Sequence, residues 1–254
     1  MFLSFLQGDT RIKDALRWSF SIDNKIFAIN LFYEEVLEQI PKCFDALKTS
    51  EEEGIGSLDE AFKLAVKYEA FLNSIYALCE NLSRIICCLY RSKTLPQNFS
   101  EQRSRFLKDS SIDSDYSTIL KATDWYDEVS AIRSEATHYL SGLIVFPSPA
   151  KLGYANIPKS KRRGTPDKIL INNIENHLKQ IYGELLTFLS LFGRHFLKIL
   201  NPDSRLSYMC LSSSSKKMIG SRSISLKELL ASEKWTCQGS ATCPARRTCD
   251  AKKS

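Results

Sequence analysis

The chain has 254 residues, of which 43% are hydrophobic and 25% are charged. These proportions are typical of a globular protein and argue against disorder throughout. The net charge of +6 is compatible with a polyanionic partner but is too mild to indicate one. The first residues, MFLSFLQGD, lack a basic start, and no segment approaches the ~20 consecutive apolar residues that a membrane span needs. We therefore predict a soluble, cytoplasmic protein without a membrane partner.

Four segments repeat apolar residues at helical spacing. We expect a kink at Pro41 in the first and a capping box formed by Ser57 and Glu60 at the start of the second. Shared apolar stripes of this length pack helices against one another at shallow angles. The predicted helices lie at about residues 25–47, 57–89, 125–143 and 166–200.

Two short stretches are the best candidates for strands. GLIVFP (142–147) and LGYANIP (152–158) could pair as a small hairpin. Together with the four helical segments they predict an all-α fold, an antiparallel bundle of four or more long helices with one small β-hairpin as a candidate addition.

The composition changes after Pro202, which predicts two parts, a helical bundle over 1–203 and a largely disordered segment over 204–254. LSSSSKKMIGSRS (211–223) has the composition of a linker. SLKELLASEKW (225–235) is predicted to be a short helix with its own capping box. We expect no fixed structure in the last twenty residues, which have almost no apolar side chains.

The cysteines form two groups. Four lie within apolar helical patterns, where a thiol behaves as a small core residue. The others lie near the carboxyl terminus, where the spacing C-x5-C-x5-C is wider than the C-x2–4-C that zinc sites favour, so we predict incidental thiols and no metal. The first group is Cys43, Cys79, Cys87 and Cys88, and the second is Cys210, Cys237, Cys243 and Cys249.

The third helical segment contains the candidate catalytic residues, in the stretch RSEATH. Arg133 is followed directly by the polar Ser134 and, after four intervening residues, by His138. This pattern resembles the hallmark of the HEPN superfamily (higher eukaryotes and prokaryotes nucleotide-binding domain), R-x4-6-H with a polar residue after the arginine. The flanking WYDEVSAI and YLSG look like the large all-helical bacterial subgroup, and the resemblance covers roughly residues 20 to 200.

The resemblance implies a function as well as a fold. Many HEPN proteins are metal-independent endoribonucleases, often toxins or defence proteins that act as homodimers, and others are inactive pairing modules. It implies Arg133 and His138 as catalytic residues, no cofactor, RNA as substrate, and an antitoxin or other regulatory protein as a possible partner. A related subgroup that accepts adenylyl groups has a tyrosine two places after the histidine. This chain departs from that pattern, because it has Leu140 there and Tyr139 one place early.

The residue types suit RNA cleavage without a metal. A histidine with a pKa near neutrality can exchange a proton with the ribose 2′-hydroxyl or the leaving oxygen. An arginine can neutralise the charge that develops on the phosphoryl oxygens. The product would be a 2′,3′-cyclic phosphate.

The spacing of the pair is awkward on one straight helix. Five residues place Arg133 and His138 ~140° apart around the axis and ~7.5 Å apart along it. They could converge if the helix loosens near Ser141 and Gly142, or across the two-fold axis of a dimer. Ser134 and Glu135 share the face of His138, where either could orient the imidazole and Glu135 could raise its pKa. The alternative is that these residues only solvate the outer face of the helix.

Other candidates carry weaker signals. The long loop after the third helical segment contains a basic cluster that could hold an RNA backbone or could simply be solvated. His195 lies on the apolar stripe of the fourth segment and is predicted to be a hydrogen-bonded core histidine, whereas His177 is assigned no role. The basic cluster is Lys159, Lys161, Arg162 and Arg163.

The leading hypothesis is therefore a metal-independent HEPN-type endoribonuclease that works as a homodimer. The main alternative is a non-catalytic helical module that pairs with itself or with a regulatory partner. A third possibility is nucleotide binding without turnover.

Overall fold

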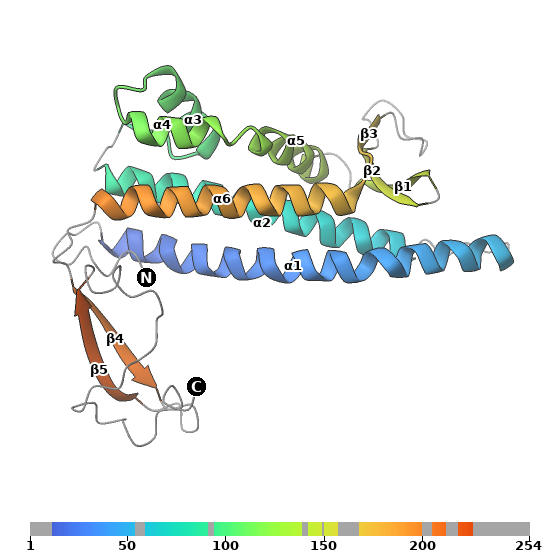
Figure 1. The fold of residues 1–254 in the computed structure, drawn as a ribbon, viewed down its shortest axis with the longest axis horizontal. Coiled ribbons are helices and arrows are strands. Elements are labelled where there is room, and N and C mark those ends of the chain that lie inside the picture. Colours follow the sequence, from blue (N-terminus) through green and yellow to red (C-terminus); the bar gives the residue numbers. More distant parts are fainter. Residues whose placement is uncertain are drawn as a thin grey trace. The chain divides into compact units, whose positions relative to one another are not determined.

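A computed structural model describes residues 12–53, 59–90, 94–138, 142–148, 150–156, 168–199, 205–211 and 218–225. The contacts divide the chain into two compact units, which we describe separately. One unit is Phe20–His195, and the second includes the strands after residue 204. The described residues form six helices and five strands (Figure 1).

The described part of the chain is mostly helical, which confirms the predicted all-α bundle. The helices of the first unit pack along one another, with α5 in contact with α2, and α3 in contact with both α2 and α4 (Figure 1). The helices are α1 (Ile12–Glu53), α2 (Asp59–Leu89), α3 (Phe99–Lys108), α4 (Ser114–Lys121), α5 (Trp125–His138) and α6 (Ile174–Ile199).

The core is built from the apolar stripes that the sequence displays. Two of these stripes, one on α2 and one on α6, are a major source of stability, because each fully buried leucine or isoleucine contributes roughly 1.5–3 kcal/mol relative to an exposed one. The buried stripe of α2 comprises Ala65, Tyr68, Leu72, Ile75, Cys79, Leu82 and Ile86, and that of α6 comprises Ile174, Leu178, Ile181, Leu185, Phe188 and Phe192.

Helix α1 is longer than predicted and continues as one helix through Pro41. Proline removes one helical hydrogen bond and leaves the carbonyl of Leu37 without its usual donor. Because Pro41 is exposed, water can satisfy the groups that its ring displaces. Ser57, the predicted cap of α2, lies outside the described residues.

The predicted hairpin is confirmed and is extended by a third strand. Strands β1 (Leu143–Ser148) and β2 (Lys151–Asn156) pair antiparallel, and β2 also pairs with β3 (Lys168–Ile171). The prediction that residues 168–171 begin the fourth helix was wrong. Lys-Ile-Leu-Ile fits either period, and pairing with β2 decides the outcome. Gly153 permits the close approach of β3, because a Cβ there would lie 2.8 Å from the Ile171 carbonyl oxygen.

Helices α3 and α4 were not predicted, because each is too short for a clear apolar repeat. Capping residues define their starts. The side chain of Asn98 accepts a hydrogen bond from the Glu101 N–H, and that of Asp113 accepts one from the Tyr116 N–H.

In the second unit, β4 (Arg205–Leu211) and β5 (Met218–Ser225) form an antiparallel hairpin with Ser207 opposite Ser223. The sequence had predicted a linker over 211–223. A serine-rich composition suggests a linker, but ladder hydrogen bonds are made by the backbone and do not require apolar side chains. The remainder of the predicted short helix and the cysteine-containing tail lie outside the described residues.

Candidate functional site

Helix α5, which carries the RSEATH motif, is fixed by its apolar face. Trp125, Tyr126, Val129 and Ile132 are at most 5% exposed, and the helix packs against α2. These four side chains form part of the core. The motif therefore stands on a rigid element, which is the placement that a precise site requires.

Arg133 lies against an aromatic side chain of α2. Its guanidinium carbon is 4.5 Å from the centroid of the Tyr76 ring, and Tyr76 in turn stacks on Tyr126 with the ring planes 15° apart. A cation over a ring face is attracted by the ring quadrupole. A guanidinium carries five N–H donors in a planar fork, an arrangement that suits a phosphate or carboxylate.

His138 is the last residue of α5, and the three residues that follow it lie outside the described part of the chain. Its backbone is described but its side chain is not, so the distance between the imidazole and the Arg133 guanidinium stays a prediction. Ser134 and Glu135 are half-buried on α5. Tyr139 lies outside the described residues.

The basic cluster of the loop, which could hold an RNA backbone or could simply be solvated, also lies outside the described residues. It comprises Lys159, Lys161, Arg162 and Arg163.

The start of α5 is tied to α3 by one arginine. Arg103 donates to both carboxylate oxygens of Asp127, at 2.9 and 2.8 Å, and to Asp124 at 2.5 Å. The Arg103 side chain is only 12% exposed, whereas both carboxylates face solvent. Nη1 of Arg103 bonds Asp127 and Nη2 bonds Asp124, so the two ends of one guanidinium orient the first turn of α5.

A buried histidine joins α5 to α2 and α6. The Tyr68 hydroxyl and Nδ1 of His177 are hydrogen-bonded at 2.6 Å, and Nε2 of His177 lies 3.4 Å from a carboxylate oxygen of Glu128. Burial lowers the pKa of His177, and the neighbouring Glu128 carboxylate opposes that shift. His177 was assigned no role from the sequence, because its partner Tyr68 lies 109 residues away.

Glu69, the neighbour of Tyr68 on α2, binds the main chain just beyond the motif. Its Oε1 accepts a hydrogen bond from the Gly142 N–H at 2.7 Å and another from the Tyr154 hydroxyl at 2.7 Å. The Gly142 N–H is also 3.1 Å from the Tyr154 oxygen. Tyr154 is 2% exposed, and burial together with Glu69 raises the pKa of its hydroxyl, which therefore remains a donor.

His195 is confirmed as a hydrogen-bonded core histidine. Its Nε2 is 2.9 Å from Asp113, whose carboxylate also accepts from the Tyr90 hydroxyl and caps α4. Burial acts to raise the pKa of Asp113, but the Tyr116 N–H, Tyr90 and His195 outweigh it and hold the pKa below its ordinary value. These contacts join the start of α4 to α6 and to the residue that follows α2, and they do not include the motif.

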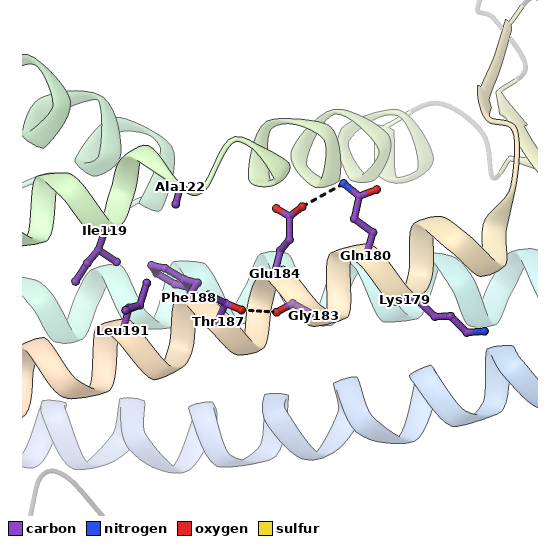
Figure 2. A pocket seen from close by; sticks show the side chains of 9 residues that line it. All are labelled: Ile119, Ala122, Lys179, Gln180, Gly183, Glu184, Thr187, Phe188 and Leu191. Carbon is purple, nitrogen blue, oxygen red and sulfur yellow. Dashed lines mark hydrogen bonds between the residues drawn. The ribbon is translucent and has the colours of Figure 1, made fainter.

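A groove of about 500 Å³ lies between α4 and α6 (Figure 2). Figure 2 shows Ile119 and Ala122 on one side of it and residues of α6, including Phe188 and Leu191, on the other. Neither Arg133 nor Glu135 lines it, so it is not part of the predicted site.

The buried thiols agree with their prediction as core residues. Cys43 and Cys79 are at most 2% exposed, and burial raises the pKa of Cys43 to about 11. Cys87 and Cys88 are half-buried. Within the described residues there is no group of three metal-ligating side chains, and no helix there is long and apolar enough to cross a membrane.

Comparison with known proteins leaves the family open. No protein family, no curated protein and no solved structure matches the chain.

Proposed function

We propose that this protein is a metal-independent endoribonuclease of the HEPN type, with a role in toxicity or defence. The observation that supports it best is the contact of Arg133 with Tyr76, at 4.5 Å. It places a half-buried guanidinium against an aromatic ring on a helix packed into the core, five residues before a histidine. A pre-positioned guanidinium stabilises developing phosphoryl charge better than a mobile one, because it needs no reorganisation as the reaction proceeds.

The proposed reaction begins at a ribose 2′-hydroxyl. The 2′-oxygen loses its proton and forms a bond to the adjacent phosphorus, while the bond from phosphorus to the 5′-oxygen breaks. The 5′-oxygen takes up a proton, so the products are a 2′,3′-cyclic phosphate and a 5′-hydroxyl. His138 acts as general base or general acid, and Arg133 neutralises the charge on the non-bridging oxygens.

A second copy of the chain is part of the proposal. Along a straight α5 the two motif side chains start ~140° apart around the axis, which is poor geometry for contacting the same phosphate. A two-fold dimer can instead place Arg133 of one protomer beside His138 of its partner. The basic side chains at 159–163 are proposed to hold the flanking RNA backbone.

The test is cleavage of a fluorescently labelled RNA in the presence of EDTA. Wild-type protein should cleave it, and His138→Ala should reduce kcat by roughly 10²- to 10⁴-fold, the usual contribution of acid–base catalysis. Arg133→Ala should lower it by a similar factor. The matched control is Arg105→Ala, which removes the same charge from an exposed position on α3 and should leave cleavage unchanged. Activity that disappears with EDTA, or that persists in His138→Ala, contradicts the proposal.

The second candidate is a non-catalytic pairing module, and the Arg133–Tyr76 contact offers it some support as well. An arginine that stacks on an aromatic ring can serve packing alone. This candidate predicts no RNA cleavage by the wild type, together with normal dimers when Arg133 and His138 are both replaced by alanine. RNA cleavage by the wild type distinguishes the two functions, and analytical ultracentrifugation of that double variant tests whether pairing is independent of the motif.

A further inference from the structure

We infer that Glu69 is a positioning residue for the proposed active site, holding the chain beyond His138 so that the imidazole keeps its place relative to Arg133. This inference rests on the proposed function. Glu69 belongs to α2 and is distant in sequence from the motif, yet its carboxylate binds the main chain at Gly142, four residues after His138.

A single oxygen of the Glu69 carboxylate makes both of its contacts with this part of the chain. One carboxylate oxygen accepts hydrogen bonds from a backbone N–H and from a buried tyrosine hydroxyl, each at 2.7 Å. Hydrogen bonds to an ionised acceptor are about twice as strong as neutral ones. A Cβ on Gly142 would lie 2.1 Å from Cζ of Tyr154, so the chain can approach this anchor only because residue 142 is glycine.

Adjacent positions of α2 bond residues that lie near the two ends of the motif segment. Tyr68 holds His177, which faces Glu128 on α5 before the motif, and Glu69 holds Gly142 after it. The ring centroids of Tyr68 and Tyr154 are 5.2 Å apart, so the two groups of contacts also touch each other.

The hydrogen bond between Glu69 and Gly142 lies close enough to His138 along the chain to limit the movement of the end of α5. Four residues of chain span at most ~14 Å when fully extended, so fixing Gly142 restricts where the last turn of α5 can move. A catalytic group must be held within about 0.5 Å of its productive position, and a misplacement of about 1 Å can cost roughly a hundredfold in rate. A loosened end of α5 would therefore reduce turnover even with Arg133 and His138 present.

The experiment compares Glu69→Ala and Glu69→Gln in the full chain with wild type in the RNA cleavage assay, well below the melting temperature of each. Glutamine keeps an oxygen acceptor, so it should keep most of the activity, whereas alanine should lower kcat by roughly 10- to 100-fold with little change in KM. Amide hydrogen exchange over residues 130–138 should become faster in Glu69→Ala. The matched control is Tyr90→Phe, which removes a hydroxyl that donates to Asp113, a contact that does not include the motif.

Wild-type kcat in Glu69→Ala overturns the inference while leaving the proposed nuclease intact. The inference also fails if Tyr90→Phe, at a similar loss of stability, reduces kcat as much, since the effect would then reflect general destabilisation. If the wild-type protein cuts no RNA, the proposed function fails, and the positioning role fails with it.

Discussion

Gly142 is the position where a single added methyl group has the most predictable effect on folding. A Cβ there would lie 2.1 Å from Cζ and 2.4 Å from the hydroxyl oxygen of Tyr154, a buried ring without room to move. Overpacking of this kind typically costs about 1–3 kcal/mol. We expect Gly142→Ala to reduce the free energy of unfolding by about that amount, as measured by urea denaturation.

The chain contains a matched control for this substitution. Gly183 lies exposed in the middle of α6, and a Cβ added there would meet no atom within 4 Å. Because alanine favours helix over glycine, Gly183→Ala should raise the free energy of unfolding by about 0.5–1 kcal/mol. Equal effects of the two substitutions would show that the approach of Gly142 to Tyr154 does not constrain the fold.

At the scale of the elements, His177 makes the packing of α2, α5 and α6 sensitive to pH. It faces the hydroxyl of Tyr68 from α2 and the carboxylate of Glu128 from α5. Burial lowers its pKa, so the unfolded chain binds a proton more readily than the folded one. The stabilisation that neutral His177 contributes is therefore present above the pKa of an unfolded histidine, about 6.5. It is lost as the pH falls below that value towards the pKa of His177 in the folded protein.

We therefore expect the stability of the wild type to fall more steeply between about pH 7 and pH 5 than that of His177→Gln, which can still bond Tyr68 but does not titrate. The measurement is urea denaturation of both proteins at a series of pH values. Parallel pH profiles would show that protonation of His177 is not coupled to folding.

The elements divide clearly into those that a single sequence can predict and those that it cannot. The stripes of α2 and α6 are predictable because burial of one face imposes the helical period over many turns. Strand β3 is not, since Lys168–Ile171 fits a helix or a strand equally well and only pairing with β2 selects between them. Helices α3 and α4 depend on single capping residues, which are common in loops as well.

The candidate site divides in the same way. Arg133 and His138 could be nominated because they are close in sequence and of types suited to phosphoryl chemistry. Tyr76 and Glu69 could not, because α2 meets α5 and Gly142 only after the bundle has packed. Such long-range contacts depend on how side chains fill the space between helices, and no short pattern records that.

At the scale of the whole molecule, the proposed dimer makes each active site depend on two chains. If Arg133 of one protomer serves His138 of its partner, a dimer that combines Arg133→Ala with His138→Ala contains one site with both residues intact and one with neither. If each protomer instead carries its own complete site, the same mixed dimer has no intact site. The two arrangements therefore differ in a quantity that an activity assay measures directly.

We expect the two inactive variants to recover activity when they are mixed and allowed to exchange subunits. At equal concentrations half of the dimers are mixed, and one site in each is intact, so the recovered rate should approach about a quarter of the wild-type rate. Native mass spectrometry confirms that mixed dimers have formed. Mixing either variant with the Arg133→Ala, His138→Ala double variant is the control and should give no recovery, since no combination then restores a complete pair. Mixed dimers that form but stay inactive would place both residues of each site in one protomer, and α5 would then have to bring Arg133 and His138 together within a single chain.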